Sequence, residues 1–225
     1  MKKRFPGRIS DWVLHKDNQL VVFNKPAGLP VQPDRSEGPN LQQIGAAYIR
    51  HDLYLIHRLD RPVSGVVAMG QRAGAQGKVS EEMKAGGVQK IYLAIVAEPP
   101  PQPRVTLKHY LTDGPKNRTL VSEEETAGSR YAELDYQLLA RSDRYHLLRV
   151  DLKTGRKHQI RAQLGAIGCP VRGDEKYGFR RRNPDGNIDL HAYQLHLTHP
   201  GSGKRMIFTA PPPDTPVWQA FADQL

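Results

Sequence analysis

The sequence predicts an α+β fold: an extended, mixed and mainly antiparallel β-sheet flanked by helices. Runs of β-branched and aliphatic residues outnumber the helical patterns, and the helices do not alternate strictly with the strands. One pair of apolar runs is separated only by a short polar turn, which is typical of an antiparallel hairpin. At 225 residues, we expect a single domain over residues 1–225.

The first predicted elements are a strand and a helix. Residues 20–24 (LVVFN) form a short apolar strand, which ends at Lys25-Pro26 because proline cannot continue regular pairing. Residues 41–50 form a helix, and Asn40 is a suitable N-cap for it.

Two apolar runs and the segment between them give the next three elements. Residues 66–69 and 91–96 are rich in β-branched and aliphatic residues, which predicts buried strands. Residues 75–85 between them predict a helix that ends at Gly86-Gly87.

The second half of the chain begins with the hairpin. Residues 131–140 and 145–152 are its strands, and the polar segment 142–144 is its turn. Residues 159–167 are predicted to form a helix. Residues 194–198 and 206–208 are predicted strands, joined by a turn that contains Gly201 and Gly203.

Three proline-rich or polar segments lie outside these elements, at 98–103 (EPPPQP), 180–187 (RRRNPDGN) and 210–216 (APPPDTP). Polyproline segments are stiff connectors that do not join a core. The first is a candidate boundary between two halves of the chain, although too few apolar runs flank it to predict separate domains.

Composition excludes several classes of protein. No apolar stretch approaches the roughly 18 residues of a membrane-spanning helix, and the N-terminus lacks the apolar core of a signal peptide. The single cysteine, Cys169, rules out a disulfide framework and a multi-cysteine zinc site. We therefore expect a soluble protein of a reducing compartment.

The net charge indicates a partner. Lysine and arginine number 33 against 23 aspartate and glutamate, which gives a formal net charge of +10. Such an excess favours a polyanion, and nucleic acid is the default candidate. The alternative is a basic, solvated surface with no specific partner.

The densest polar cluster is HRLDRP at residues 57–62, which follows an apolar run and precedes the predicted strand at 66–69. Here Asp60 lies between Arg58 and Arg61. Arginine within reach of a carboxylate favours its ionised form, which is the form that acts as a nucleophile. The alternative is a structural salt bridge that ties two strands together.

A second cluster, TGRKHQIR at residues 154–161, places four basic side chains within two helical turns. Arg156, Lys157 and Arg161 are predicted to share much of one helix face. Because like charges repel, an anion should compensate them, either a carboxylate from elsewhere in the fold or a phosphate at the helix N-terminus. A solvated basic face is the alternative.

Other chemical signals are weak. His191, His196 and His199 are the closest group of histidines, but His196 and His199 point to opposite faces of a strand, so we predict no metal site. No glycine-rich loop matches a phosphate-binding fingerprint, and Ser64 lacks the frame of a serine hydrolase.

Together, these segments resemble the RluA-type RNA pseudouridine synthase family. The two main signatures are HRLDRPVSG at 57–65 and TGRKHQIRAQLGAIGCPVRGDEKYG at 154–178. Three weaker blocks agree in order and spacing: FNKPAGLPV at 23–31, QKIYLAIV at 89–96 and LHAYQLHLTHP at 190–200.

The resemblance implies a pseudouridine-synthase-like fold with a central active-site cleft, and isomerisation of selected uridines in RNA without a cofactor. The catalytic aspartate of the family corresponds to Asp60, and the tyrosine packed against the target base to Tyr92. The basic residue that pairs with the aspartate corresponds to Arg161. The arginine that replaces the flipped nucleotide in the RNA stack corresponds to Arg58.

The remaining expectations rest partly on this resemblance and partly on the residues themselves, since no heptad or apolar stripe indicates an oligomer and no histidine spacing fits a metal. We place His57, Arg156 and His158 in the substrate-binding part of the site. The partner is RNA, either tRNA or rRNA, and we expect a cytoplasmic monomer with no metal and no separate N-terminal RNA-binding domain. Target choice is then expected to rest on the catalytic domain. The loop of Arg180 to Arg182 is a candidate for this role, and a solvated run of charges is the alternative. Val63 departs from the family, which usually has threonine there.

Two rival functions stay open. The first is an RNA-binding protein that keeps the fold without turnover. The second is a hydrolase that uses Asp60 with His57 as a base, although the features of an oxyanion hole or metal are missing from the sequence.

Overall fold

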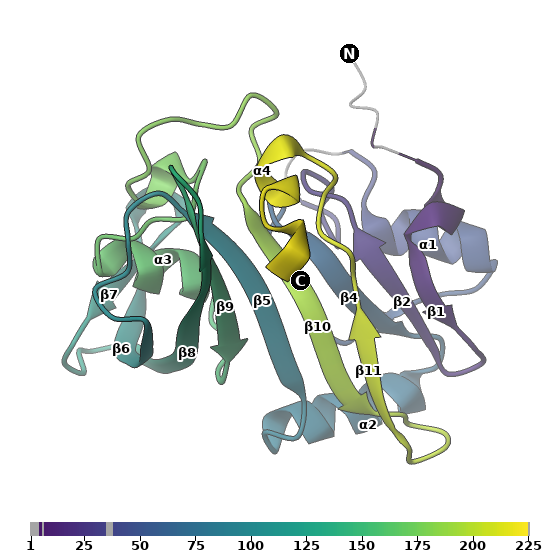
Figure 1. Cartoon of the computed structure of the whole chain (residues 1–225). Helices are drawn as coiled ribbons and strands as arrows, with labels where there is room; N and C mark the ends of the chain where they lie inside the picture. Colours follow the sequence, from purple (N-terminus) through teal and green to yellow (C-terminus); the bar gives the residue numbers. More distant parts are fainter. Residues whose placement is uncertain (1–4, 6, 35–37, 225) are drawn as a thin grey trace. The chain divides into compact units, whose positions relative to one another are not determined.

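Antiparallel strand pairs with a few short helices make up most of the structure, as the sequence predicts (Figure 1). The computed structural model describes residues 5, 7–34 and 38–224. The chain divides into two units, Met1–Gln89 with Ala192–Pro213 and Lys90–His191 with Asp214–Leu225. The division falls inside a strand, so the candidate boundary at 98–103 is wrong. A single catalytic domain over 1–225 stays a prediction.

The first unit contains a sheet with two helices. Its strands run in the order β1-β2-β4-β10, with β3 paired to β4 and β11 paired to β10. The elements of this unit are η1 (Ile9–Trp12), β1 (Val13–Lys16), β2 (Leu20–Lys25), α1 (Leu41–Ile49), β3 (Tyr54–Leu55), β4 (Ser64–Gly70), α2 (Ala73–Lys84), most of β10 (Leu190–Thr198) and β11 (Arg205–Thr209).

The two helices cover opposite faces of β2. Alternate residues of a strand point to opposite faces, and Leu20 and Val22 lie in one buried cluster with Val79 of α2. Phe23 points the other way, toward α1, where a Cβ added to Gly45 would lie 3.1 Å from the Phe23 ring. Strand β4 is therefore buried along its whole length, as predicted for residues 66–69.

The end of β2 and the start of β4 lie side by side. These strands pair antiparallel from Leu20 opposite Gly70 to Lys25 opposite Gly65. Asn40 caps α1 by accepting a hydrogen bond from Gln43 N–H, as predicted. The residues that precede Ser64 form the loop that carries Asp60. This register brings that loop next to the residues that follow Lys25.

The second unit contains a sheet in the order β5-β9-β8-β6-β7, in which every pairing is antiparallel. The predicted hairpin forms between β8 and β9, and Ser142 N–H donates to Tyr145 O across its turn. The elements of this unit are β5 (Gln89–Val96, whose first residue belongs to the first unit), β6 (Arg104–Gly114), η2 (Pro115–Asn117), β7 (Arg118–Ser122), β8 (Arg130–Arg141), β9 (His146–Leu152), α3 (Gln159–Ala166), η3 (Glu175–Tyr177), α4 (Pro216–Gln219) and η4 (Ala222–Gln224).

The register places Tyr92 on the face that α3 covers. Tyr92 of β5 lies opposite Val150 of β9, which lies opposite Tyr136 of β8. Alternation along β8 and β6 puts His109 on the same face, and Gln163 of α3 bonds to His109 there, with 2.9 Å between Gln163 Nε2 and His109 Nδ1. Helix α3 therefore packs over the face to which Tyr92 points.

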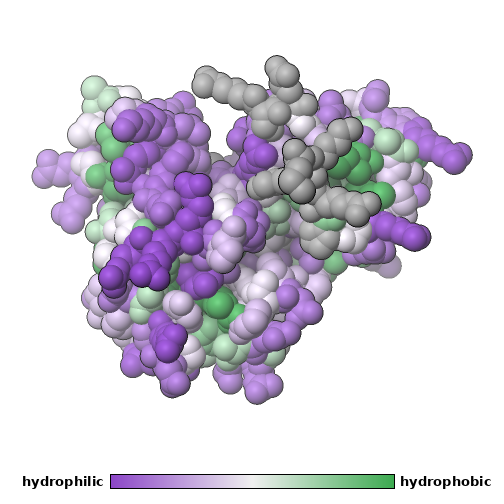
Figure 2. All heavy atoms as spheres, turned by 90° about the horizontal axis from the view of Figure 1, so that it is seen from above, coloured by the Kyte–Doolittle hydropathy of each residue, from purple (hydrophilic) through white to green (hydrophobic). Residues whose placement is uncertain are grey.

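The face seen in Figure 2 is largely hydrophilic. Figure 2 shows polar residues over much of the visible face, with hydrophobic residues in small groups. None of the helices in the described part of the chain has the length and apolar character of a membrane-crossing helix.

Candidate active site

Asp60 lies on a turn between β3 and β4. Val63 N–H donates to Asp60 O at 3.1 Å, which closes the turn. Arg58 is exposed, Leu59 is buried and Asp60 is half-buried. Leu59 therefore anchors the loop in the core, and its arginine neighbour projects into solvent.

The segment after β2 fastens this turn from the other side. Gly28 N–H donates to Arg61 O at 2.7 Å, and Arg61 Nε donates to Gly28 O at 3.1 Å. The Lys25 ammonium is fully buried and donates to three carbonyls, those of Pro26, Leu29 and Arg61, at 3.0, 2.8 and 3.3 Å. The loop that carries Asp60 is thus held through its neighbour Arg61.

Sequence reasoning missed Lys25, because a lysine before a proline indicates only the end of a strand. Burial lowers the pKa of Lys25 to about 7, while the negative charge of Asp60 opposes this shift and the positive charge of Arg61 adds to it. Its place in the FNKPAGLPV block at 23–31 is the signal that could have indicated a role.

His57 bonds to the protein backbone. Ala68 N–H donates to His57 Nε2 at 3.1 Å, so this nitrogen carries a lone pair and the neutral ring has its proton on Nδ1. The imidazole continues the hydrogen bonding of β4 beyond the point where β3 ends at Leu55. Because this nitrogen already accepts a hydrogen bond, the geometry disfavours His57 as a hydrolytic base.

The second basic cluster is arranged differently from the prediction. Helix α3 begins at Gln159, so Arg156 and Lys157 precede it and are exposed, whereas Arg161 is buried with 5% exposure. The prediction that these three cations share one helix face is therefore wrong. Carboxylates from elsewhere in the fold compensate two of the three, which was one of the two alternatives: Asp174 pairs with Arg161, and Asp113 pairs with Lys157 at 2.9 Å.

Hydrogen bonds of polar side chains shape the loop before α3. Gln159 Oε1 accepts from Thr154 Oγ1 at 2.8 Å and from Arg156 N–H at 3.0 Å. His158 has a left-handed backbone, with φ of 51°, and its Nδ1 lies 2.8 Å from the Tyr177 hydroxyl. Arg156 Nε donates to Tyr131 O at 3.0 Å.

The predicted site residues thus form two groups. The Asp60 loop holds His57, Arg58 and Asp60 in the first unit. The second unit brings Tyr92 and the α3 group to one face of its sheet, the α3 group being Arg156, His158 and Arg161. The pairing of Arg161 with Asp60 would join the two units and stays a prediction.

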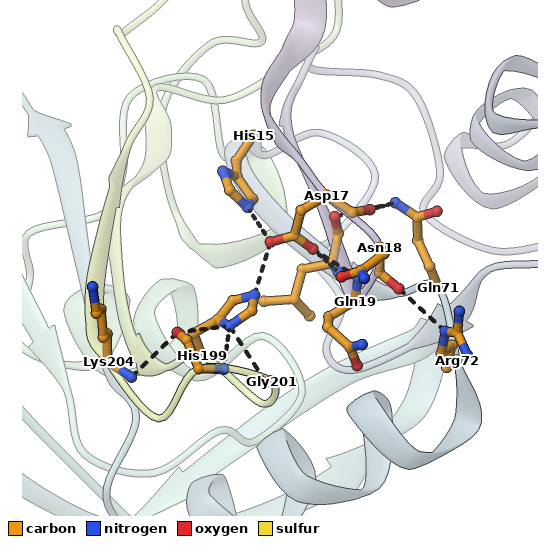
Figure 3. A network of polar contacts seen from close by, with 11 residues as sticks. His15, Asp17, Asn18, Gln19, Gln71, Arg72, His199, Gly201 and Lys204 are labelled. Carbon is orange, nitrogen blue, oxygen red and sulfur yellow. Dashed lines mark hydrogen bonds and ion pairs between the residues drawn. The ribbon is translucent and has the colours of Figure 1, made fainter.

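One set of metal-ligating side chains lies together among the described residues, and it is not the set weighed from the sequence. Ligand atoms of His15, Asp17 and His199 lie within 4.8 Å of one another (Figure 3). The Nε2 atoms of both histidines are 2.8 Å from Asp17 Oδ2.

The hydrogen bonds of this set argue against a metal. The N–H groups of Gly201 and Ser202 point at His199 Nδ1, at 3.3 and 3.0 Å, so Nδ1 is the acceptor and Nε2 carries the proton. A histidine that ligates a metal through Nε2 normally donates from its other nitrogen. His199 instead donates to Asp17, and the set joins the β1–β2 turn to the β10–β11 turn.

Hydrogen bonding also keeps Asp17 ionised. Partial burial acts to raise the pKa of Asp17, but the N–H groups of Leu20 and Gln19 and the two histidines outweigh it and lower the pKa to about 2. An ionised Asp17 can accept from both histidines at once.

The comparisons with known proteins identify the family. Residues 19–166 match the RNA pseudouridylate synthase family. The chain is 31% identical to ribosomal large subunit pseudouridine synthase D of Nitrosomonas europaea, covering 90% of this chain and 62% of that protein. It is also 31% identical to tRNA pseudouridine synthase C of Salmonella typhi, over 88% of this chain and 84% of that protein.

Solved structures show the same fold. Human RNA pseudouridylate synthase domain containing 4 superimposes with a TM-score of 0.77 over 93% of this chain and 92% of that chain, at 23% identity. Human RNA pseudouridylate synthase domain containing 1 gives 0.75 over 96% and 89%, also at 23% identity. These likenesses confirm the predicted fold class.

The sequence matches define a class of enzymes that isomerise uridine in RNA, and the solved structures share the fold of this chain. This chain belongs to the RNA pseudouridylate synthase family. The predictions of an RluA-type family, an isomerase and RNA modification are therefore confirmed at the level of the class.

Proposed function

We propose that this protein isomerises specific uridines in structured RNA, either tRNA or rRNA, to pseudouridine without a cofactor. The observation that carries the proposal is the Asp60 loop, where a half-buried carboxylate lies beside the exposed Arg58 and is fastened through Arg61 to Lys25 and Gly28. Fixing a reactive group on a braced loop avoids the entropic cost of orienting it during the reaction.

The reaction rearranges one nucleotide. The N1–C1′ bond breaks with its electron pair left on uracil, and the detached base rotates. The C5–C1′ bond then forms, the C5 proton is lost and N1 takes up a proton, so the product is an isomer of the uridine. Asp60 acts either as the nucleophile at C1′ or as the base that removes a sugar proton to give a glycal. Tyr92 lies against the base, and Arg161 pairs with the Asp60 carboxylate.

The target nucleotide must leave the RNA stack before this chemistry can occur. Extruding a base costs a few kcal/mol. The exposed guanidinium of Arg58 fills the gap and offsets part of that cost. Stacking of the extruded base on the Tyr92 ring contributes about 1–3 kcal/mol more.

The other proposed binding residues act around this centre. Arg156 and His158 contact the RNA beside α3. His57, whose Nε2 accepts the Ala68 N–H, serves the substrate by holding the loop in place. The net charge of +10 supplies phosphate affinity. We further propose that the protein works as a cytoplasmic monomer.

Tritium release tests this function. Unmodified tRNA and rRNA transcribed with 5-tritiated uridine are incubated with the wild-type protein, with Asp60→Ala and with Asp143→Ala. Asp143 is an exposed aspartate in the β8–β9 turn and serves as the matched control. Release by the wild type and by Asp143→Ala, but not by Asp60→Ala, supports the proposal and identifies the substrate class.

Retained release by Asp60→Ala would contradict the assignment of Asp60. The rival function, RNA binding without turnover, makes a different prediction. Under that function, Asp60→Asn would restore a deletion strain almost fully, because binding depends mainly on lysine and arginine.

A further inference from the structure

The proposed reaction assigns no role to the turn that follows α3. It carries RGDEKYG, residues 172–178, the end of the second signature block. Gly173 has φ of +85°, and a Cβ there would lie 2.6 Å from Asn183 Nδ2. The N–H groups of Tyr177 and Phe179 both donate to Asp174 O, at 3.1 and 3.0 Å. The turn is therefore tightly specified by its own backbone.

This turn presents two side chains to Arg161. Asp174 accepts hydrogen bonds from Arg161 Nε at 2.6 Å and from Nη2 at 2.9 Å, and both side chains are almost completely buried, at 2% and 6% exposure. The Tyr177 ring lies against the guanidinium, with Arg161 Cζ 5.1 Å from the ring centroid. Asp174 thus holds one edge of the guanidinium, and Tyr177 holds one face.

The tyrosine is itself fixed. Its hydroxyl accepts a hydrogen bond from Thr119 N–H at 2.8 Å and lies 2.8 Å from His158 Nδ1. A planar guanidinium held at an edge by two bonds and at a face by a ring cannot rotate without breaking contacts. The direction of Arg161 is therefore set within the second unit.

We propose that Asp174 is a positioning residue of the reaction, which orients Arg161 by this side-on ion pair. The inference rests on the proposed function, in which Arg161 pairs with the catalytic carboxylate. The pair uses Nε and Nη2, so the Nη1 end of the guanidinium is directed away from Asp174. Asp174 also compensates a buried positive charge that would otherwise be costly to keep beside the site.

The main test is turnover by Asp174→Asn. Asparagine keeps the size of the side chain and one acceptor oxygen. It loses the negative charge and one of the two hydrogen bonds from Arg161. We expect kcat to fall on the order of ten- to a hundred-fold. Because Asp174 is buried, the RNA dissociation constant should stay within about two-fold. Asp174→Glu, which restores the charge, should recover part of the lost kcat.

A double variant tests whether Asp174 acts through Arg161. If the two residues work as one unit, Asp174→Asn combined with Arg161→Lys should lose little more than the worse single variant. Fully multiplied losses would overturn the proposal, because Asp174 would then act by another route.

A matched control separates positioning from stability. Asp189 pairs with Arg172 at 2.5 Å in the same unit, and these side chains are also largely buried, at 10% and 20% exposure. Asp189→Asn should lower Tm without changing kcat. An equal loss of kcat in Asp189→Asn and Asp174→Asn would overturn the proposal, since lost stability would explain both.

A spectroscopic readout does not depend on turnover. The Arg161 Nε–H should exchange slowly with solvent in the wild type and faster in Asp174→Asn, by ¹⁵N NMR. Wild-type kcat in Asp174→Asn would overturn this inference alone. A wild-type protein that releases no tritium from any RNA would overturn the proposed function and this inference with it.

Discussion

Lys25 is fully buried, and three backbone carbonyls surround its ammonium group. Because its pKa is lowered to about 7, the unfolded chain binds one more proton than the folded protein between about pH 7 and pH 10.5. The cost of burying the charge is fully present below pH 7 and is relieved as pH rises through this window.

The free energy of unfolding should therefore rise with pH in this window, by up to about 1.4 kcal/mol per pH unit from this group. Lys25→Met should remove that component. Urea unfolding between pH 7 and 9.5 measures it, and Lys84→Met, at an exposed lysine, gives the background. Parallel curves for wild type and Lys25→Met would contradict the prediction.

Arg58 gives a second prediction at this scale. Arg58→Ala should reduce tritium release from folded RNA more than from a short single strand carrying the same uridine, because a single strand has no stack to fill. Initial rates on the two substrates measure the difference. Equal losses on both would count against a stack-filling role.

Prediction from sequence worked unevenly for individual residues. Asp60 and Arg58 stood out because charged residues cluster in an apolar neighbourhood. Lys25 and Asp174 did not, because each depends on partners distant in sequence: Arg61 O for Lys25, and the Arg161 guanidinium for Asp174. A local pattern carries no information about such pairs.

At the scale of elements, Gly65 allows β4 to approach β10 closely. Gly65 has φ of +114°, and a Cβ there would lie 2.2 Å from Ala192 O in β10. Both the backbone conformation and the neighbouring strand therefore exclude a side chain.

Gly65→Ala should lower the free energy of unfolding by about 2 kcal/mol or more. Gly77→Ala, inside α2 with no atom within 4 Å of its added Cβ, should raise it by about 0.5–1 kcal/mol. Denaturant unfolding of both variants measures whether each substitution lowers or raises the free energy of unfolding. Stabilisation by Gly65→Ala would contradict the close approach of β4 and β10.

The elements that sequence patterns predicted are those with continuous or regular burial. The strands β2, β4, β5, β8 and β9 and the helices α1, α2 and α3 lie where predicted, within a few residues. Strand β6 was missed because His109 interrupts its apolar face, and β7 because Thr119 is its buried residue while Leu120 is 49% exposed. In these two strands, tertiary contacts decide which residues are buried, and the hydrophobic pattern of the sequence does not.

For the whole molecule, charge should govern RNA affinity. The logarithm of the binding constant should fall linearly with the logarithm of salt concentration. Replacing the exposed Arg180 and Arg181 by alanine should reduce that slope by about 1–2. Arg182→Ala, whose side chain pairs with Glu175 at 3.1 Å, should reduce it less. Filter binding across salt concentrations measures the slope for each variant. Unchanged slopes would exclude the loop of Arg180 to Arg182 from the RNA interface.

Turnover should also survive exhaustive chelation, because the proposed chemistry needs only Asp60, Tyr92 and Arg161. Tritium release after EDTA treatment and gel filtration measures this. A loss that added zinc restores would contradict it, and His15→Ala would then test whether the set around Asp17 holds the metal.

Each of the two units is built from two separate segments of the chain. The first unit needs residues 192–213 to complete its sheet, and the second takes residues 214–225, including Trp218, which packs against His191. A nascent chain emerges from its N-terminus onward. The first unit cannot complete its sheet before β10 and β11 have left the ribosome. A translational pause earlier in the message would therefore leave the apolar strand β4 without its neighbour β10.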